Sequence, residues 1–384
     1  NETRGEISKF PRLYGPWAKN YTDGSGRLKL GWVLHQPELS KTYEAIAKTG
    51  AAEFYGGDFG KRMVAHLAET GGSIGMADLE AFWTNIGACW REPSQARYRA
   101  LTVHIPPPPC EGFQMLEALR ILDGFEVGKL ERNGIEHVDT VLRAIRLAAG
   151  DRIRFNNPKS EKLAELLGEA NIARHRLRVA DGKVIDGPTE QWTGEAGGDQ
   201  HTTSMSVGDS EGNLVCLTNS LGSPYGSGVI VPGTGVTLNN FLYWADVQPS
   251  SPNRTKPGDA LPMCMAPTIS TRDGVGVLAL GTPGSYGILQ TQVQAMVQHV
   301  DFGQPLQDAI EAPRVRLWDG RQIEPESRLG PQVIEALRAR GHDVVAGDAW
   351  TMRVGGMHAV ARDPATGLMT AGCDPRRDGY VVAL

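Results

Sequence analysis

The sequence lacks the features typical of disulfide-stabilised, zinc-binding and membrane-spanning proteins. Its five cysteines are odd in number, widely spaced and without a Cys-x-x-Cys pair, which disfavours a disulfide framework or a zinc site. The nine histidines show no ligand spacing such as His-Glu-x-x-His. The longest apolar runs, such as 275–280, fall far short of the roughly 18 to 20 residues that a membrane span needs. We therefore predict no metal, no cofactor and no membrane partner.

An excess of one charge is also missing. The chain has 39 Lys and Arg against 44 Asp and Glu, a net charge of −5, and no basic tract, so nucleic-acid binding has little electrostatic support. Its 384 residues, 40% hydrophobic and 22% charged, are enough for one large core or two ordinary ones. A small-molecule partner is the favoured expectation.

The most informative segment that is present is Gly-Gly-Asp-Gln-His-Thr-Thr-Ser-Met-Ser-Val at 197–207. Its polar and apolar residues alternate from Thr203 to Val207, as in a half-buried strand. The turn residues at 209–213 and the apolar run 214–217 follow, so the pattern predicts a hairpin. An ordinary structural hairpin is the simplest interpretation.

The second interpretation of this segment is chemical. Threonine is a weak nucleophile inside a chain because its hydroxyl needs a base within hydrogen-bond reach. If the chain is cut between His201 and Thr202, the new α-amino group, with an ordinary pKa of roughly 7.7 to 8.0, becomes that base once the site lowers its pKa. The segment then supplies nucleophile and base in one residue.

Further motifs occur in order along the chain. They include Leu-Asn-Asn, Ala-Pro-Thr, Leu-Gly-Thr-Pro-Gly and Asp-Pro-Arg-Arg-Asp-Gly at 238–240, 266–268, 280–284 and 374–379, and upstream segments at 51–55, 71–73 and 98–109. Each is weak alone, but together they cover nearly the whole chain, which resembles the γ-glutamyltranspeptidase family of N-terminal-nucleophile (Ntn) hydrolases. The resemblance implies an α+β fold, the four-layer αββα sandwich.

The resemblance also implies a domain organisation. Residues 1–201 would be the C-terminal, mostly helical part of a large subunit, and 202–384 a small subunit, joined in one structural domain after self-cleavage. Family members carry a long upstream segment with an arginine that clamps the substrate α-carboxylate, so we expect this chain to be a fragment or a trimmed product. The compartment, cytoplasmic or periplasmic, and any further oligomer stay open.

Three positions are expected to complete the chemistry. The family's two oxyanion-hole glycines fall on Gly284 and Ser285, where backbone N–H groups would face the developing negative charge. A plain strand-to-helix turn is the alternative. The family's supporting threonine hydroxyl falls on Ser220, which keeps a hydroxyl.

The substrate contacts match poorly. The family's asparagine falls on Gly222, its glutamine on Phe241, its aspartate on Trp244 and its paired serines on Met263 and Cys264. Because a site built to hydrogen-bond a zwitterion depends on such polar groups, their loss predicts a more apolar or aromatic acyl group than γ-glutamyl. The alternative is that Asp246 replaces the missing acid from a shifted loop.

Periodicity predicts the secondary structure in a helical first half and a mixed second half. The expected helices are 37–49, 60–70, 112–122, 134–149, 160–169, 288–300, 305–311 and 330–340. The expected strands are 101–105, 205–207, 214–218, 236–238, 268–270, 275–280, 344–345, 358–362 and 380–384.

Three other functions stay open. The segment 283–287 is one residue away from a Gly-x-Ser-x-Gly elbow, which would make Ser285 the nucleophile of an unrelated serine hydrolase. An unprocessed relative could serve as a binding protein. A standard γ-glutamyl enzyme with relocated contacts is the third.

Overall fold

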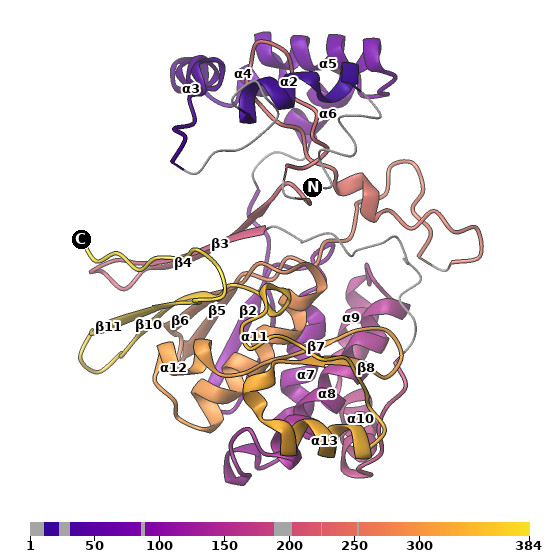
Figure 1. Cartoon of the computed structure of the whole chain (residues 1–384), viewed down its shortest axis with the longest axis vertical. Helices are drawn as coiled ribbons and strands as arrows, with labels where there is room; N and C mark the ends of the chain where they lie inside the picture. The colour runs from indigo at the N-terminus through magenta and orange to yellow at the C-terminus, as the bar shows by residue number, and fades with distance from the viewer. Residues whose placement is uncertain (1–10, 23–30, 86–88, 188–201, 224, 252) are drawn as a thin grey trace. The chain divides into compact units, whose positions relative to one another are not determined.

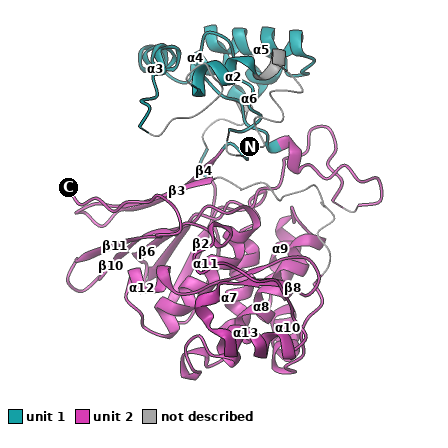
Figure 2. Cartoon of the chain, in the orientation of Figure 1, with its two compact units in different colours: residues 1–90, 221–241 teal, residues 91–220, 242–384 magenta. Residues whose placement is uncertain are grey.

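The computed structural model describes residues 11–22, 31–85, 89–187, 202–223, 225–251 and 253–384. The chain divides into two compact units, which Figure 2 colours separately. Unit 1 comprises residues 1–90 and 221–241, and unit 2 comprises 91–220 and 242–384. This division differs from the expected subunit boundary after residue 201, which stays a prediction because 188–201 lie outside the described residues.

The described part of unit 1 is mainly helical. Its helices are α2 (Pro11–Tyr21), α3 (Pro37–Thr49), α4 (Ala52–Tyr55), α5 (Asp58–Thr70) and α6 (Met76–Asn85). A small core joins Phe59, Met63 and Leu79 of the helices to Val231 from the returning segment. The strand expected at 236–238 is wrong: this segment makes a single bridge, Ile230 to Thr237, because it turns back on 229–231 with no further strand beside it.

Unit 2 is built on a six-stranded antiparallel sheet in the order β1-β2-β5-β6-β10-β11 (Figure 1). The strands are β1 (Ser94–Tyr98), β2 (Leu101–Ile105), β5 (Thr268–Arg272), β6 (Val275–Gly281), β10 (His358–Arg362) and β11 (Met369–Cys373). Alternate residues of β1 and β2 are buried, as expected for strands with one face on a core.

Helices cover one face of this sheet. The helices that contact it are α7 (Phe113–Leu122), α11 (Ile288–Met296) and α12 (Leu306–Glu311), while α8 (Ile135–Arg154), α9 (Ser160–Leu166), α10 (Glu169–Ala180) and α13 (Pro331–Ala339) pack against these helices or one another. Leu119 of α7, Ile145 of α8 and Met296 of α11 join Val103 and Leu280 of the sheet in one apolar core. Burial of this core supplies the main driving force for folding unit 2.

Two smaller sheets complete unit 2. The hairpin of β3 (Thr202–Gly208) and β4 (Leu214–Ser220) contacts β6 and β10, while β7 (Val315–Leu317), β8 (Gln322–Pro325) and β9 (Asp343–Val344) form a three-stranded sheet. The last helical turn after α11 widens into a π-helical segment, Val297–Asp301. The helices and the mainly antiparallel sheets, in which only the described pair β8–β9 is parallel, confirm the predicted α+β class.

Most predicted elements are present within a few residues of their expected bounds. The strand expected at 380–384 is wrong, because β11 occupies the edge beside β10 and the last residues have no paired strand. Tyr380 is accordingly 84% exposed. Within the described residues, no helix is both long and apolar enough to cross a bilayer.

Candidate functional site

Thr202 is the first residue of β3 and lies directly opposite Ser220, the last residue of β4. The Thr202 hydroxyl donates a hydrogen bond to Ser220 Oγ over 3.1 Å. Both side chains are partly buried. The antiparallel register therefore brings together two of the predicted catalytic residues, while His201 lies outside the described residues.

The turn of this hairpin fixes that register. Asp209 accepts hydrogen bonds from the backbone N–H groups of Glu211 and Asn213 and from the Asn213 side chain, at 3.0, 2.9 and 2.8 Å. These bonds, the Asn213 side chain first, lower the pKa of Asp209. Gly212 has a φ of +90°, a conformation that a residue with a Cβ rarely adopts. The turn signal in the sequence thus has a direct structural role.

Gly281 determines how closely the hairpin approaches the large sheet. A Cβ at this position would lie 2.1 Å from Ser204 Oγ and 2.9 Å from Cys216 Sγ. The hydroxyl of Ser206 donates to the carbonyl of His358 at 2.9 Å, which ties the same face of the hairpin to β10. The opposite face carries four apolar side chains that are about half exposed: Met205, Val207, Val215 and Leu217.

The predicted oxyanion loop follows β6 directly. Gly284 has a φ of +128° and Ser285 a φ of +50°, and the short 3-10 turn Ser285–Gly287 leads into α11. Thr282 Oγ accepts a hydrogen bond from the Gly356 N–H at 3.0 Å, and Gly355 lies against Gly284. This glycine contact from a distant segment gave no signal in the sequence.

The Ser285 side chain is buried and lies against the thiol of Cys264. Burial, and next the charge of Glu111, raises the pKa of Cys264 far above its ordinary value, so this thiol stays protonated. Cys264 has no exposed surface. Its contact with Ser285 therefore stabilises the loop from within the buried cluster.

A buried ion pair supports Tyr286, the next residue of the loop. The Arg152 guanidinium lies over the Tyr286 ring, 4.1 Å from its centre, and donates to Glu111 Oε1 at 3.1 Å and to Gln114 Oε1 at 2.8 Å. Trp244 lies near Tyr286, with 6.3 Å between their ring centres, and both side chains pack against one small buried cluster. Sequence reasoning missed Glu111 and Arg152, because no motif links residues 41 positions apart.

The surroundings of Gly222 in unit 1 favour a glycine. Gly222 has a φ of +95°, and a Cβ there would lie 2.1 Å from the side-chain oxygen of Asn240. That amide is held by Ser223, whose N–H donates to Oδ1 at 3.0 Å and whose Oγ accepts from Nδ2 at 2.8 Å. Phe241 follows in the same unit. Asn240 thus occupies the space that a side chain at 222 would need.

Asp246 and Met263 belong to unit 2, where Asp246 is held within its own loop and Met263 is paired with the distant segment 109–111. The Asp246 carboxylate accepts hydrogen bonds from the Gln248 N–H, at 3.0 Å, and from the Ser251 hydroxyl. Met263 exchanges backbone bonds with Pro109 and Glu111 at 2.9 and 2.7 Å. Both Asp246 oxygens therefore stabilise its loop, which disfavours their use as a replacement substrate clamp.

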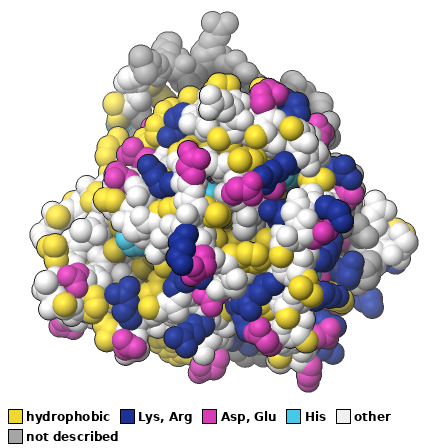
Figure 3. Space-filling model, turned by 90° about the horizontal axis from the view of Figure 1, so that it is seen from below, with side chains coloured by type: hydrophobic (Ala, Val, Ile, Leu, Met, Phe, Trp, Pro, Cys, Tyr) yellow, Lys and Arg dark blue, Asp and Glu magenta, His cyan; other side chains and the backbone are white. Residues whose placement is uncertain are grey.

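Two cavities of unit 2 lie apart from the predicted nucleophile and oxyanion loop. One, of about 880 Å³, lies between the start of α9 and the segment 249–262, and the other, of about 370 Å³, lies between α8 and α10. Neither is lined by Thr202, Ser220 or Gly284. On the face drawn in Figure 3, basic and acidic side chains are interspersed, so that face presents no extended surface of one charge.

Comparison with known proteins decides the family. The family model for gamma-glutamyltranspeptidase matches residues 1–384, which is the whole of this chain. The chain belongs to the gamma-glutamyltranspeptidase family. The predicted family membership is thereby confirmed.

Individual relatives agree. The chain is 32% identical over 391 residues to the acylase ACY 1 proenzyme of Pseudomonas sp. strain SE83, covering 100% of the chain and 66% of that protein. It is 27% identical over 376 residues to the glutathione hydrolase proenzyme of Bacillus subtilis, covering 93% and 63%. The chain thus spans a little less than two thirds of these relatives.

The fold has a solved counterpart. The crystal structure of a cephalosporin acylase from Bacillus halodurans superimposes with a TM-score of 0.85 at 26% identity, covering 100% of this chain and 70% of that one. This agreement confirms the predicted Ntn-hydrolase fold of the family.

Proposed function

We propose that this chain is the reacting part of an Ntn amide hydrolase or acyltransferase that cleaves itself before Thr202 and accepts an acyl group other than standard γ-glutamyl. The observation that carries the proposal is the hydrogen bond from Thr202 to Ser220 at the start of a hairpin packed on β6. The names of the relatives add support, since both the acylase and the glutathione hydrolase are proenzymes.

The first step is maturation. Thr202 Oγ attacks the carbonyl carbon of His201, and the peptide C–N bond breaks, so that the nitrogen takes a proton and becomes the α-amine of Thr202. Water then hydrolyses the resulting ester between His201 and the Thr202 oxygen. The products are a carboxylate on His201 and a free Thr202 at the start of residues 202–384.

The second step is catalysis. The α-amine accepts the proton of the Thr202 hydroxyl, and Oγ attacks the carbonyl carbon of the substrate amide. The N–H groups of Gly284 and Ser285 stabilise the oxyanion, while Ser220 orients the nucleophile. The C–N bond breaks, the amine leaves with a proton, and water or another amine takes the acyl group from the threonyl ester.

The apolar acyl preference rests on the binding positions. The five positions matched to the family's substrate contacts are Gly222, Phe241, Trp244, Met263 and the buried Cys264. The acylase and cephalosporin acylase relatives favour this preference, and the glutathione hydrolase relative favours the alternative, a true γ-glutamyl enzyme.

N-terminal sequencing and intact-mass measurement of the protein that carries this chain test the proposal. We expect a break between His201 and Thr202, and no break in Thr202→Ala. An intact chain in the active wild-type protein, or a cleaved Thr202→Ala protein, contradicts the mechanism. An inactive, uncleaved wild-type protein supports the binding homologue instead.

Substrate class is tested separately, with anilides of γ-glutamate, of aromatic acids and of dicarboxylic acids. We expect a higher kcat/KM for an aromatic or dicarboxylic anilide. Faster turnover of the γ-glutamyl anilide overturns the acyl preference and leaves the threonine mechanism standing. Activity that survives Thr202→Ala and disappears in Ser285→Ala indicates a serine hydrolase.

A further inference from the structure

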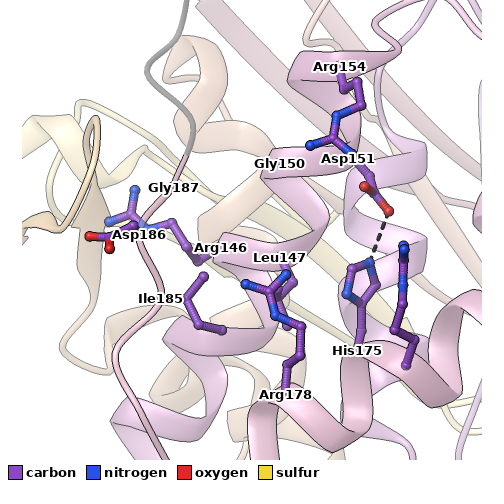
Figure 4. Close-up of a pocket in the computed structure, with 11 residues that line it drawn as sticks. Arg146, Leu147, Gly150, Asp151, Arg154, His175, Arg178, Ile185, Asp186 and Gly187 are labelled. Carbon is purple, nitrogen blue, oxygen red and sulfur yellow. Dashed lines mark hydrogen bonds and ion pairs between the residues drawn. The ribbon is translucent and has the colours of Figure 1, made fainter.

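The 370 Å³ cavity of unit 2 is lined by an unusual number of arginines. It lies between the C-terminal half of α8, the helix α10 and the segment that ends at Gly187. Arg146, Arg154, Arg174 and Arg178 line it, and Figure 4 shows Arg178 extending from α10 toward Leu147 of α8. This pocket shares no residue with the candidate catalytic site.

The acidic groups of the pocket are already paired. Asp151 Oδ2 lies 2.9 Å from His175 Nε2 and accepts from the Asn171 amide at 3.0 Å. Asp186, at the other end, is paired with Arg321. Neither carboxylate is therefore left to neutralise the remaining arginines.

The arginines differ in what they contact. Arg146 donates to the backbone carbonyls of Trp318 and Gln322, and Arg174 donates to Asn171. Within the ranges that the structure describes, Arg154 and Arg178 have neither an ion pair nor a hydrogen bond. The exposed guanidinium groups of Arg154 and Arg178 thus line the same pocket, with N–H donors that are available to a ligand.

The neighbouring cluster of Glu117, Asp151 and His175 has its ligand atoms within 4.8 Å of one another, which is compatible with a metal ion. Three observations disfavour a cation there. Asp151 and Glu117 raise the pKa of His175 despite its burial, which favours the charged imidazolium, and burial raises the pKa of Glu117 to about 8, which favours its neutral form near neutral pH. His175 Nε2 also lies within hydrogen-bond reach of both carboxyls, and the arginines line the adjoining space.

We propose that the pocket between α8 and α10 binds a small organic phosphate, with Arg154 and Arg178 holding the phosphate oxygens. Guanidinium groups suit this role because their planar donors match phosphate geometry in pairs. The buried side chains of Leu147 and Ile185 give the pocket an apolar wall for the organic part of the ligand. The volume fits the lower range of small-molecule sites.

Isothermal titration calorimetry at fixed ionic strength tests this binding, with ribose 5-phosphate, pyrophosphate and succinate as probes. The test variant is Arg154→Gln with Arg178→Gln. The matched control is Arg132→Gln with Arg272→Gln, which removes two exposed arginines of the same unit that do not line the pocket. Thermal melting by circular dichroism checks that each variant is folded.

We expect ribose 5-phosphate to bind with one-to-one stoichiometry. The pocket variant should raise the Kd for ribose 5-phosphate at least about tenfold, and the control variant should change this Kd less than twofold. Absence of phosphate binding, equal weakening in both double variants, or tighter binding of succinate overturns the proposal. If the double pocket variant is unfolded, the single variants Arg154→Gln and Arg178→Gln replace it under the same criteria. None of these readouts depends on amide hydrolysis.

Discussion

Thr202 and Ser220 lie on paired strands, whereas the positions matched in sequence to the family's substrate contacts lie outside the strands, on loops and on the short 3-10 helix Phe241–Trp244. The first pair is placed by backbone register, which many sequences satisfy equally well. The second set depends on which side chains project from turns and loops, and these change readily in evolution. The difference agrees with the proposed function, in which the nucleophile is kept while the contacts to the acyl group differ from those of a γ-glutamyl enzyme.

The largest effect is expected at the oxyanion loop. Gly284→Ala places a Cβ on a backbone with φ of +128°, so the loop must shift and its N–H groups move with it. We expect kcat to fall by about 10² to 10³. Gly303→Ala is the control, because Gly303 also has a positive φ, +61°, but a Cβ there meets nothing within 4 Å. Unchanged kcat in Gly284→Ala removes this loop from the mechanism.

The buried carboxyls outside the site should affect stability without affecting turnover. Burial raises the pKa of Glu117 to about 8, whereas His175, Glu117 and Asn171 outweigh burial and lower that of Asp151 to about 2. The stabilisation from neutral Glu117 is complete below its ordinary pKa of 4.5 and is lost as the pH rises through 8. The stabilisation from ionised Asp151 is complete above pH 3.8, its ordinary pKa, and is lost as the pH falls through about 2.

Glu117→Gln should therefore reduce the loss of unfolding free energy between pH 6 and pH 9 by on the order of 2 kcal/mol. Glutamine keeps the carbonyl that accepts from Asn171. Asp151→Asn removes a carboxylate that stabilises the folded protein in its ionised form, so this variant should have a lower free energy of unfolding at pH 7. Urea unfolding at the two pH values measures both, and a steeper decline in Glu117→Gln contradicts the assignment.

Ser220→Ala should lower kcat about tenfold, because the Thr202 hydroxyl loses the partner that holds it at 3.1 Å. Ser220→Thr keeps a hydroxyl on the same strand position and should recover most of the rate. KM is expected to stay constant in both variants. A change in KM with an unchanged kcat would indicate that Ser220 binds substrate and does not orient the nucleophile.

The smallest effect is expected at a binding position. Trp244→Asp introduces a carboxylate at the position that the sequence matches to the family's aspartate, and on the proposed function it should raise kcat/KM for the γ-glutamyl anilide about fivefold relative to an aromatic one. Trp244→Phe keeps an apolar ring and should leave the ratio unchanged. An equal response of both substrates to Trp244→Asp would show that this position does not select the acyl group.

The sequence alone determined the family, the α+β class, most helices and strands, and the candidate nucleophile. These features depend on local periodicity, turn residues such as Gly212, and motifs carried by contiguous residues. The errors at 236–238 and 380–384 have a common reason: a strand forms only beside another strand, and the sequence of one segment does not specify its neighbour.

The tertiary structure decided everything that joins distant residues. It placed Gly281 against Ser204, Gly355 against Gly284, and the ion pair of Glu111 and Arg152 beneath Tyr286. It also gathered arginines of α8 and α10 around one hollow. These contacts arise when separate elements pack on a shared core, so their distances and pKa values depend on burial and orientation that no single stretch of sequence encodes.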